Sequence, residues 1–182
     1  MSTDSDIPTV QTTRTPWQLK DIVLVVVLGV VFGFVYWVIV LAWKGLAVAM
    51  GPAGDLAQHV LFGLWLLVAP IAAAIVRRPG AGILAELIAA TVEVVFLGSP
   101  VGVPLLVAGL LQGLGSELPF LVTRFRRWTW SMYALSGLLG ALLVFGWSAV
   151  RGGWFGQNII LGRLVVQGIS GVILGGLLAK VI

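Results

Sequence analysis

The sequence predicts an all-α integral membrane protein with six transmembrane helices and with both termini in the cytoplasm. The first observation is composition: 59% of the 182 residues are hydrophobic and only 10% are charged, whereas a soluble domain is roughly half apolar and about a quarter charged. The second is that six apolar runs divide the chain. At about 20 residues per spanning helix they use about 120 residues. We therefore expect only a tail and short loops besides, with no ATPase or other soluble domain.

Residues 1–20 are rich in Ser, Thr, Asp and Pro, and such a composition favours a disordered polar tail. Residues 21–182 are expected to form a single six-helix transmembrane domain. The acidic start, and the absence of a small-residue cleavage site after the first apolar run, argue against a signal peptide.

The six apolar runs are separated by turn and helix-breaking residues. Their approximate bounds are 22–43, 56–76, 82–97, 101–123, 130–150 and 158–182. The third and fourth runs are unusual because they contain acidic and amide side chains. The chain shows no convincing internal repeat, so a transporter built from inverted repeats is not supported.

The basic residues orient these helices, because cytoplasmic loops of membrane proteins carry an excess of Lys and Arg. With an inside N-terminus, eight basic residues fall on the cytoplasmic side and two on the outer side. The inside group is Arg14, Lys20, Arg77, Arg78, Arg124, Arg126, Arg127 and Lys180, and the outside pair is Lys44 and Arg151. The expected location is a cell membrane, which the chain crosses several times.

Three carboxylates fall at bilayer depth, where a charged group is costly and therefore a candidate functional residue. Glu86 and Glu93 are seven residues apart, so a regular helix places them on one face, as a polar stripe about 10 Å long. In the next run a regular helix would point Glu117 away from Gln112. A structural role is the alternative for each of them, through a cap or an ion pair, and the leading alternative for Glu93 is a pair with Arg163.

Other residues narrow the chemistry. The chain has no Cys and one His, so we expect no metal site and no cofactor. The single histidine, His59, lies at the outer start of the second run. Trp37 and Trp65 lie deep in the membrane segments and are either packing residues or part of a pocket wall. Gly29 and Gly33 form a small-xxx-small pattern, which allows another helix to approach closely.

The order of motifs resembles the YkoE family. The resemblance is carried by Arg78-Pro79-Gly80-Ala81, by Ala85-Glu86-Leu87-Ile88-Ala89-Ala90 with Glu93, by Gly109-Leu110-Leu111-Gln112-Gly113-Leu114-Gly115-Ser116-Glu117, and by Ile169-Ser170-Gly171. Members are substrate-capture (S) subunits of energy-coupling factor (ECF) vitamin transporters, associated with thiamin and its hydroxymethylpyrimidine precursor. The resemblance implies a non-enzymatic six-helix protein that binds vitamin near its extracellular side. A coupling membrane subunit and two cytoplasmic ATPases would supply the energy, and Gly29 and Gly33 match by type the helix face that contacts the coupling subunit.

The ligand implied by the resemblance suggests roles for the polar and aromatic residues. An aminopyrimidine places an exocyclic amine beside a ring nitrogen, a pattern that a carboxylate can bind, and the thiazolium cation of thiamin favours a carboxylate or a Trp face. The expected substrate-binding residues are Glu86 and Glu93 for the pyrimidine and its charge, Gln112 for a ring nitrogen or amine, Trp65 or Trp37 for stacking, and His59 and Asn158 at the mouth. Glu117 is included because it lies in the matching motif, with a structural or gating role as plausible.

Two other classes of function stay open at this point. One is a self-contained proton-coupled carrier that uses the glutamates as a relay. The other is an intramembrane enzyme that uses Glu86, Glu93 and His59, which would require the His to lie close to a carboxylate. The residues do not distinguish thiamin from hydroxymethylpyrimidine as the ligand.

Overall fold

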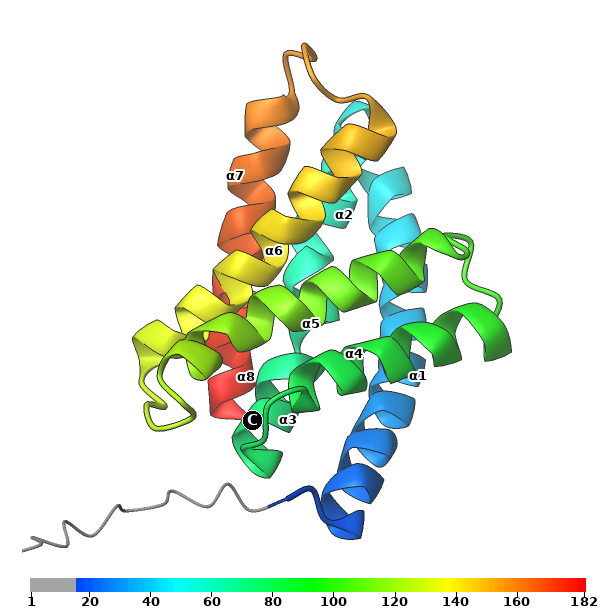
Figure 1. The fold of residues 1–182 in the computed structure, drawn as a ribbon. Coiled ribbons are helices and arrows are strands. Elements are labelled where there is room, and N and C mark those ends of the chain that lie inside the picture. The colour runs from blue at the N-terminus through cyan, green and yellow to red at the C-terminus, as the bar shows by residue number, and fades with distance from the viewer. Residues whose placement is uncertain (1–15) are drawn as a thin grey trace, which may run out of the picture.

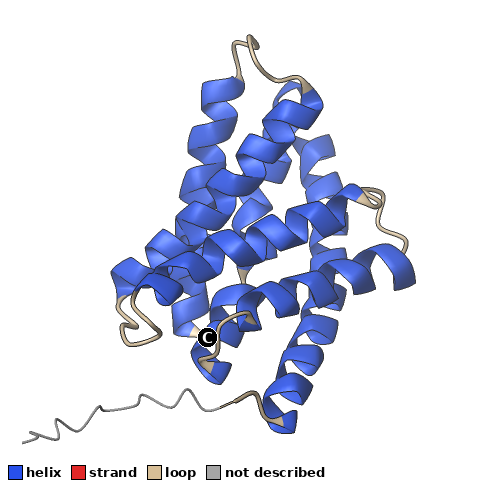
Figure 2. Ribbon diagram, in the orientation of Figure 1, coloured by secondary structure: helices blue, strands red, loops and turns tan. Residues whose placement is uncertain are grey.

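The computed structural model describes residues 16–182, and all regular structure within them is helical (Figure 2). The elements are α1 (Leu19–Met50), η1 (Gly51–Ala53), α2 (Leu56–Leu61), η2 (Phe62–Leu66), α3 (Val68–Val76), α4 (Ala81–Thr91), η3 (Val92–Phe96), α5 (Pro104–Val122), α6 (Trp130–Gly152), α7 (Ile160–Ser170), η4 (Gly171–Leu177) and α8 (Leu178–Val181). Of the expected polar tail, residues 1–15 lie outside the described residues. The last two tail residues, Leu19 and Lys20, already belong to α1, whose start is capped by Asp21 accepting a hydrogen bond from the Gln18 backbone N–H.

Each of the six predicted apolar runs corresponds to a helical rod (Figure 1). Five rods are long and apolar enough to cross a membrane: 19–53, 56–76, 104–122, 130–152 and 160–181. The exception is the rod formed by α4 and η3, which covers only residues 81–96. It is short because Gly80 and Gly98, on either side of it, have φ values of 90° and 62°, a left-handed conformation that ends a helix and that glycine adopts without strain.

Small residues let the rods pack closely. A Cβ placed on Gly171 of η4 would lie 2.6 Å from the Ala141 Cβ of α6, and one placed on Gly175 would lie 3.0 Å from the Gly63 carbonyl oxygen of η2. Side chains larger than hydrogen would separate these backbones. Close packing of this kind is what holds helices together in lipid, where the hydrophobic effect gives no drive for association.

The two ends of the bundle differ in charge. The start of α1, the α3–α4 turn, the α5–α6 turn and the C-terminus lie at one end (Figure 1), which we call the basic end because it carries Arg77, Arg124, Arg126, Arg127 and Lys180. There the Lys180 ammonium donates a hydrogen bond to the Trp128 carbonyl, and the Arg77 guanidinium lies 5.5 Å from the centre of the Trp128 ring.

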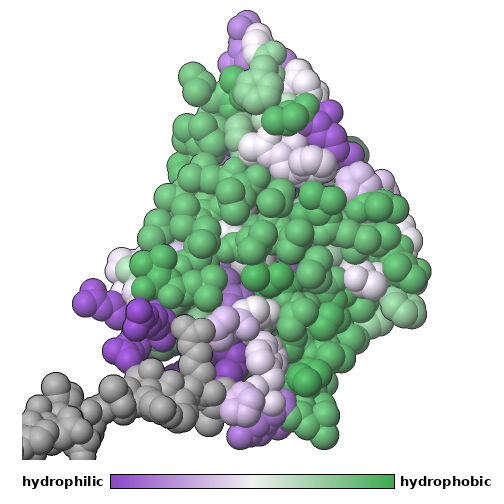
Figure 3. All heavy atoms as spheres, in the orientation of Figure 1, coloured by the Kyte–Doolittle hydropathy of each residue, from purple (hydrophilic) through white to green (hydrophobic). Residues whose placement is uncertain are grey.

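Between its ends the molecule exposes apolar side chains. The visible face is almost entirely hydrophobic, and hydrophilic residues gather towards the two extremes (Figure 3). Large apolar side chains of α1, including Val23, Val27, Val31 and Phe34, are about half exposed. An exterior of this kind suits a lipid environment.

Candidate functional site: a cavity lined by Trp, Gln and Glu

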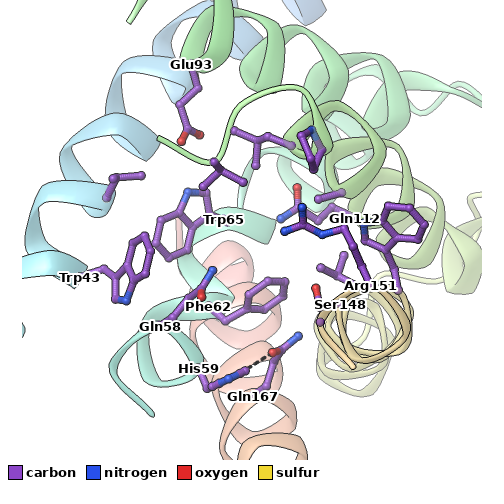
Figure 4. A pocket seen from close by; sticks show the side chains of 18 of the residues that line it. Trp43, Gln58, His59, Phe62, Trp65, Glu93, Gln112, Ser148, Arg151 and Gln167 are labelled. Atoms are coloured by element: carbon purple, nitrogen blue, oxygen red, sulfur yellow. Dashed lines mark hydrogen bonds between the residues drawn. The ribbon is translucent and has the colours of Figure 1, made fainter. Parts of the chain in front are cut away.

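A cavity of about 240 Å³ lies inside the bundle, between α1, α2, η2, η3, α5, α6 and α7 (Figure 4). It is placed towards the end that carries the α6–α7 loop and away from the basic end. The wall residues that bear on the chemistry are Trp43, Gln58, His59, Phe62, Trp65, Glu93, Gln112, Ser148, Arg151, Trp154 and Gln167.

Glu93 supplies the acidic group of the wall. It lies in the π-helical segment η3 and is 1% exposed; π-helical turns often mark functional sites, because the extra residue re-aims a side chain. Its Oε1 accepts a hydrogen bond of 2.9 Å from the Ser99 hydroxyl, whereas its Oε2 has no hydrogen-bond partner among the described residues. A buried carboxylate oxygen without a donor is costly, and a ligand donor in the cavity would satisfy it.

Aromatic side chains form much of the remaining wall. Trp65 comes from η2 and Trp43 from α1, and in Figure 4 the Trp65 indole is turned towards the Glu93 carboxylate. Phe62 and Trp154 add two further rings. Flat apolar surfaces beside a few polar groups are typical of small-molecule sites.

His59 and Gln167 form one fixed part of the wall. The His59 Nδ1 and the Gln167 Oε1 are 2.7 Å apart, and the Gln167 Nε2 donates to the Ala141 carbonyl at 2.9 Å. The His59 ring also meets the Trp154 ring edge-on, with 5.6 Å between centres. His59 therefore lines the cavity, and its hydrogen-bond partner is an amide. The arrangement that an intramembrane enzyme would need, His59 bonded to Glu86 or Glu93, is not formed.

Glu86 does not line the cavity, contrary to the expectation that it shares a polar stripe with Glu93. It is fully buried between α1 and α3, where its Oε1 accepts hydrogen bonds from the Tyr36 hydroxyl at 3.2 Å and from the Ala69 backbone N–H at 3.3 Å. The Tyr36 hydroxyl in turn accepts a hydrogen bond from the Val68 N–H. Glu93 lies in the π-helical segment η3, whose wider turn departs from the regular helical spacing on which the stripe depends.

Glu117 caps a helix. Its Oε1 accepts a hydrogen bond from the Gly80 N–H, and its Oε2 accepts from the N–H groups of Gly82 and Ile83 at 3.0 and 3.2 Å. These are unpaired donors at the start of α4, where the helix dipole also favours a negative charge. As expected, Glu117 points away from Gln112; α5 stays helical through Pro119.

Two residues expected to bind the ligand, and one helix face expected to contact a partner, lie elsewhere than predicted. Trp37 is half-buried on α1 and Asn158 is exposed in the loop before α7, and neither lines the cavity. Gly29 and Gly33 are covered within the chain: a Cβ on Gly29 would lie 2.6 Å from the Ile88 Cβ, and one on Gly33 would lie 2.7 Å from the Val92 Cβ. The face expected to meet a coupling subunit is thus occupied by α4 and η3.

Several wall residues are not among those that the sequence predicts to bind the ligand. They are Arg151, for which the sequence indicates only a topological role, and Gln58, Ser148, Trp154 and Gln167. The spacing of Gln167 and Arg163 is a signal that could have marked α7, because two long polar side chains four residues apart share one face of an apolar helix.

An apolar helical bundle around a partly polar cavity defines an integral membrane protein that binds a small molecule. The family model for the permease component of an ABC-type cobalt transport system matches residues 20–143. A curated relative from Bacillus subtilis (strain 168), "Putative HMP/thiamine permease protein YkoE", is 36% identical over 168 residues, which cover 91% of this chain and 82% of the relative. A solved structure described as an S-component of an ECF transporter is 36% identical, with a TM-score of 0.82, over 91% of this chain and 83% of that one.

The chain therefore belongs to the YkoE family of ECF transporter S components. Its relatives are transporter subunits and not enzymes. Within the described residues 16–182, no group of three His, Asp or Glu side chains is arranged to hold a metal ion.

Proposed function

We propose that this S component captures thiamin or its hydroxymethylpyrimidine precursor at the extracellular side of a bacterial plasma membrane and passes it to an ATPase-driven coupling module. The relative described as an HMP/thiamine permease supports the ligand class. The observation that carries the proposal is the buried Glu93 Oε2, which lies at the cavity wall and accepts no hydrogen bond from residues 16–182.

The wall suits an aminopyrimidine. With Oε1 held by Ser99, the free oxygen of Glu93 would accept a hydrogen bond from the exocyclic amine, and a proton shared with the ring nitrogen would complete a two-point contact. Gln112, 4% exposed, offers an amide for another ring position. Trp65 supplies a face on which the ring or a thiazolium cation can stack. Glu86 and Glu117 act as internal braces in this proposal.

The charge distribution supports a topology of six membrane segments with both termini in the cytoplasm. The start of α1, the C-terminus and the loops that carry Arg77, Arg78 and Arg124–Arg127 share the basic end, and such clusters face the cytoplasm. The cavity then lies on the extracellular side. The coupling subunit and two ATPases would contact a surface other than Gly29 and Gly33, which α4 covers.

Ligand titration of the full chain in detergent, followed by tryptophan fluorescence and thermal shift, tests the proposal. Thiamin and hydroxymethylpyrimidine should bind and raise the melting temperature, because a ligand that binds only the folded state stabilises it. Glu93→Gln should weaken binding about 10- to 100-fold, the equivalent of a charged hydrogen bond of about 1.5–3 kcal/mol. The matched control, Glu86→Gln, changes a buried carboxyl group outside the cavity and should bind within a few-fold of the wild type.

Two results would overturn the proposal in different ways. No binding of any thiamin-related compound by the wild type would remove the ligand class, and full-strength binding by Glu93→Gln would remove the site. Uptake should require co-expression with a coupling subunit and ATPases. Transport of thiamin by the chain alone in liposomes, driven by a proton gradient, would favour the proton-coupled carrier.

A further inference from the structure

The cavity has a second polar side, across from Glu93. Arg151 and Ser148 of α6 and Gln112 of α5 line it together, and in Figure 4 the Arg151 side chain extends from α6 into the cavity, on the side opposite Glu93. Arg151 forms no hydrogen bond, ion pair or ring contact with any described residue, unlike Arg163 near the same end, which has two hydrogen-bonding partners. An unpaired guanidinium therefore faces the space a ligand would fill.

We infer that Arg151 makes this S component a receptor for phosphate monoesters of its pyrimidine ligand. This inference rests on the proposed function and adds a substrate class to it. The aminopyrimidine ring lies against Glu93 and Trp65, and the phosphoryl group lies against Arg151. The residue that selects the ester is distinct from those that bind the ring.

The donor set fits a phosphoryl group. A guanidinium presents a planar fork of N–H donors that matches two phosphate oxygens at once. Ser148 adds a hydroxyl donor, which has no hydrogen-bond partner among the described residues. A free hydroxymethyl or hydroxyethyl group would use only part of this set.

The depth of the two sides supports the same orientation. Glu93 is 1% exposed and Gln112 is 4% exposed, whereas Arg151 is exposed at the end of α6. A doubly charged group bound at Arg151 keeps part of its hydration, which lowers the cost of desolvation. The uncharged ring occupies the dry part of the cavity.

A lipid headgroup offers the same phosphate chemistry to an Arg at the membrane surface. The structure favours the ester, because Arg151 lines the same enclosed space as the buried Gln112. The experiment therefore compares lipid-free and lipid-containing samples.

The test is titration of the full chain, in a non-ionic detergent without phospholipid, with four probes: hydroxymethylpyrimidine, its phosphate, thiamin and thiamin monophosphate. The variants are Arg151→Gln, Arg151→Lys and Lys44→Gln, the last being an exposed cation at the same end that does not line the cavity. The wild type should bind each ester at least as tightly as its alcohol. Arg151→Gln should lose about 10- to 100-fold for the esters and less than twofold for the alcohols, Arg151→Lys should lose an intermediate amount, and Lys44→Gln should match the wild type.

Much weaker ester binding by the wild type, or equal losses for esters and alcohols in Arg151→Gln, would overturn the inference. So would an ester preference that disappears in nanodiscs of anionic phospholipid, since a headgroup would then occupy Arg151. Failure of the wild type to bind either alcohol while it binds an ester would count against the proposed ligands and would leave the phosphate site standing. If the wild type binds none of the four probes, both proposals are overturned.

Discussion

Arg163 of α7 holds Asp55, 108 residues earlier in the chain, through two charged hydrogen bonds. The Arg163 Nε donates to one carboxylate oxygen at 2.7 Å, and the Nη2 donates to the other at 3.1 Å. The third arm of the guanidinium donates to Gln157 at 2.7 Å, and its carbon lies 4.7 Å from the centre of the Trp154 ring. Arg163 thus ties the turn before α2 to the loop before α7. It does not pair with Glu93, whose Oε2 has no partner in the described part of the chain.

Asp55→Asn should destabilise the fold and loosen the cavity wall. The Arg163 side chain is 10% exposed and that of Asp55 is 48% exposed, so solvent screens the pair in part and the loss should be about 1–2 kcal/mol. Because Trp154 packs on Arg163, bound ligand should also dissociate faster. Thermal unfolding and stopped-flow tryptophan fluorescence measure both effects. A double-mutant cycle with Arg163→Gln is the control, and additive losses would contradict direct coupling.

Gly33→Ala should destabilise the isolated chain. The added Cβ would lie 2.7 Å from the Val92 Cβ and 3.0 Å from the Ala89 carbonyl oxygen, and overpacking of this kind costs about 1–3 kcal/mol. Gly45→Ala is the matched control in the same helix, because an added Cβ there would have no described residue within 4 Å apart from the adjacent backbone of α1. Melting temperatures of the two variants, measured in the absence of a coupling subunit, test this prediction. Unchanged stability combined with loss of coupling-subunit capture would return Gly33 to the role of a partner interface.

Glu117→Ala should lower stability without altering the cavity. It leaves the Gly80, Gly82 and Ile83 N–H groups without their acceptor, a loss of about 3 kcal/mol at a buried helix start. Glu117→Gln retains one acceptor and should lose less. Thermal unfolding gives the order of stability, and thiamin titration below the melting range should give near-wild-type affinity. Selective loss of affinity with full stability would instead make Glu117 a ligand contact.

Single-cysteine labelling should place both chain ends on the cytoplasmic side. The chain contains no Cys, so each variant carries a single cysteine that can be labelled. The three positions are well exposed: Phe155 by 68%, Leu19 by 77% and Ile182 by 73%. A membrane-impermeant maleimide should label Phe155→Cys in intact cells, and Leu19→Cys and Ile182→Cys only after permeabilisation. Six crossings return the chain to its starting side, whereas five do not. Labelling of Leu19→Cys but not of Ile182→Cys in intact cells would therefore contradict the six-segment topology.

Much of the architecture follows from local sequence. Four of the predicted spans coincide with long helical rods to within a few residues, and the first, predicted at 22–43, lies inside the longer rod 19–53, because apolar runs and the turns that separate them are local properties. The exception, α4 with η3, is the run that Glu86 and Glu93 interrupt. The two glutamates interrupt its apolar sequence, and Gly80 and Gly98 limit the rod to residues 81–96.

The candidate site was only partly predictable, and the three glutamates show why. Each is an acidic residue in an apolar helix, so composition and depth mark all three alike. The tertiary contacts then separate them. Tyr36 and α3 engage one oxygen of Glu86, and the start of α4 engages both oxygens of Glu117. Oε2 of Glu86 and Oε2 of Glu93 both lack a hydrogen-bond partner among the described residues, but of the three glutamates Glu93 is the one that lines the cavity.

The sequence by itself determined that the chain is helical and apolar and where its charges lie along it, because these depend on residues close together in the chain. Only the tertiary structure decided which side chains meet in the cavity, that Arg163 pairs with Asp55, and that α4 covers Gly29 and Gly33. The physical reason is that burial and hydrogen bonding depend on which helices pack together. A polar residue in a membrane helix signals that it needs a partner, and the fold determines whether that partner is the protein or a ligand.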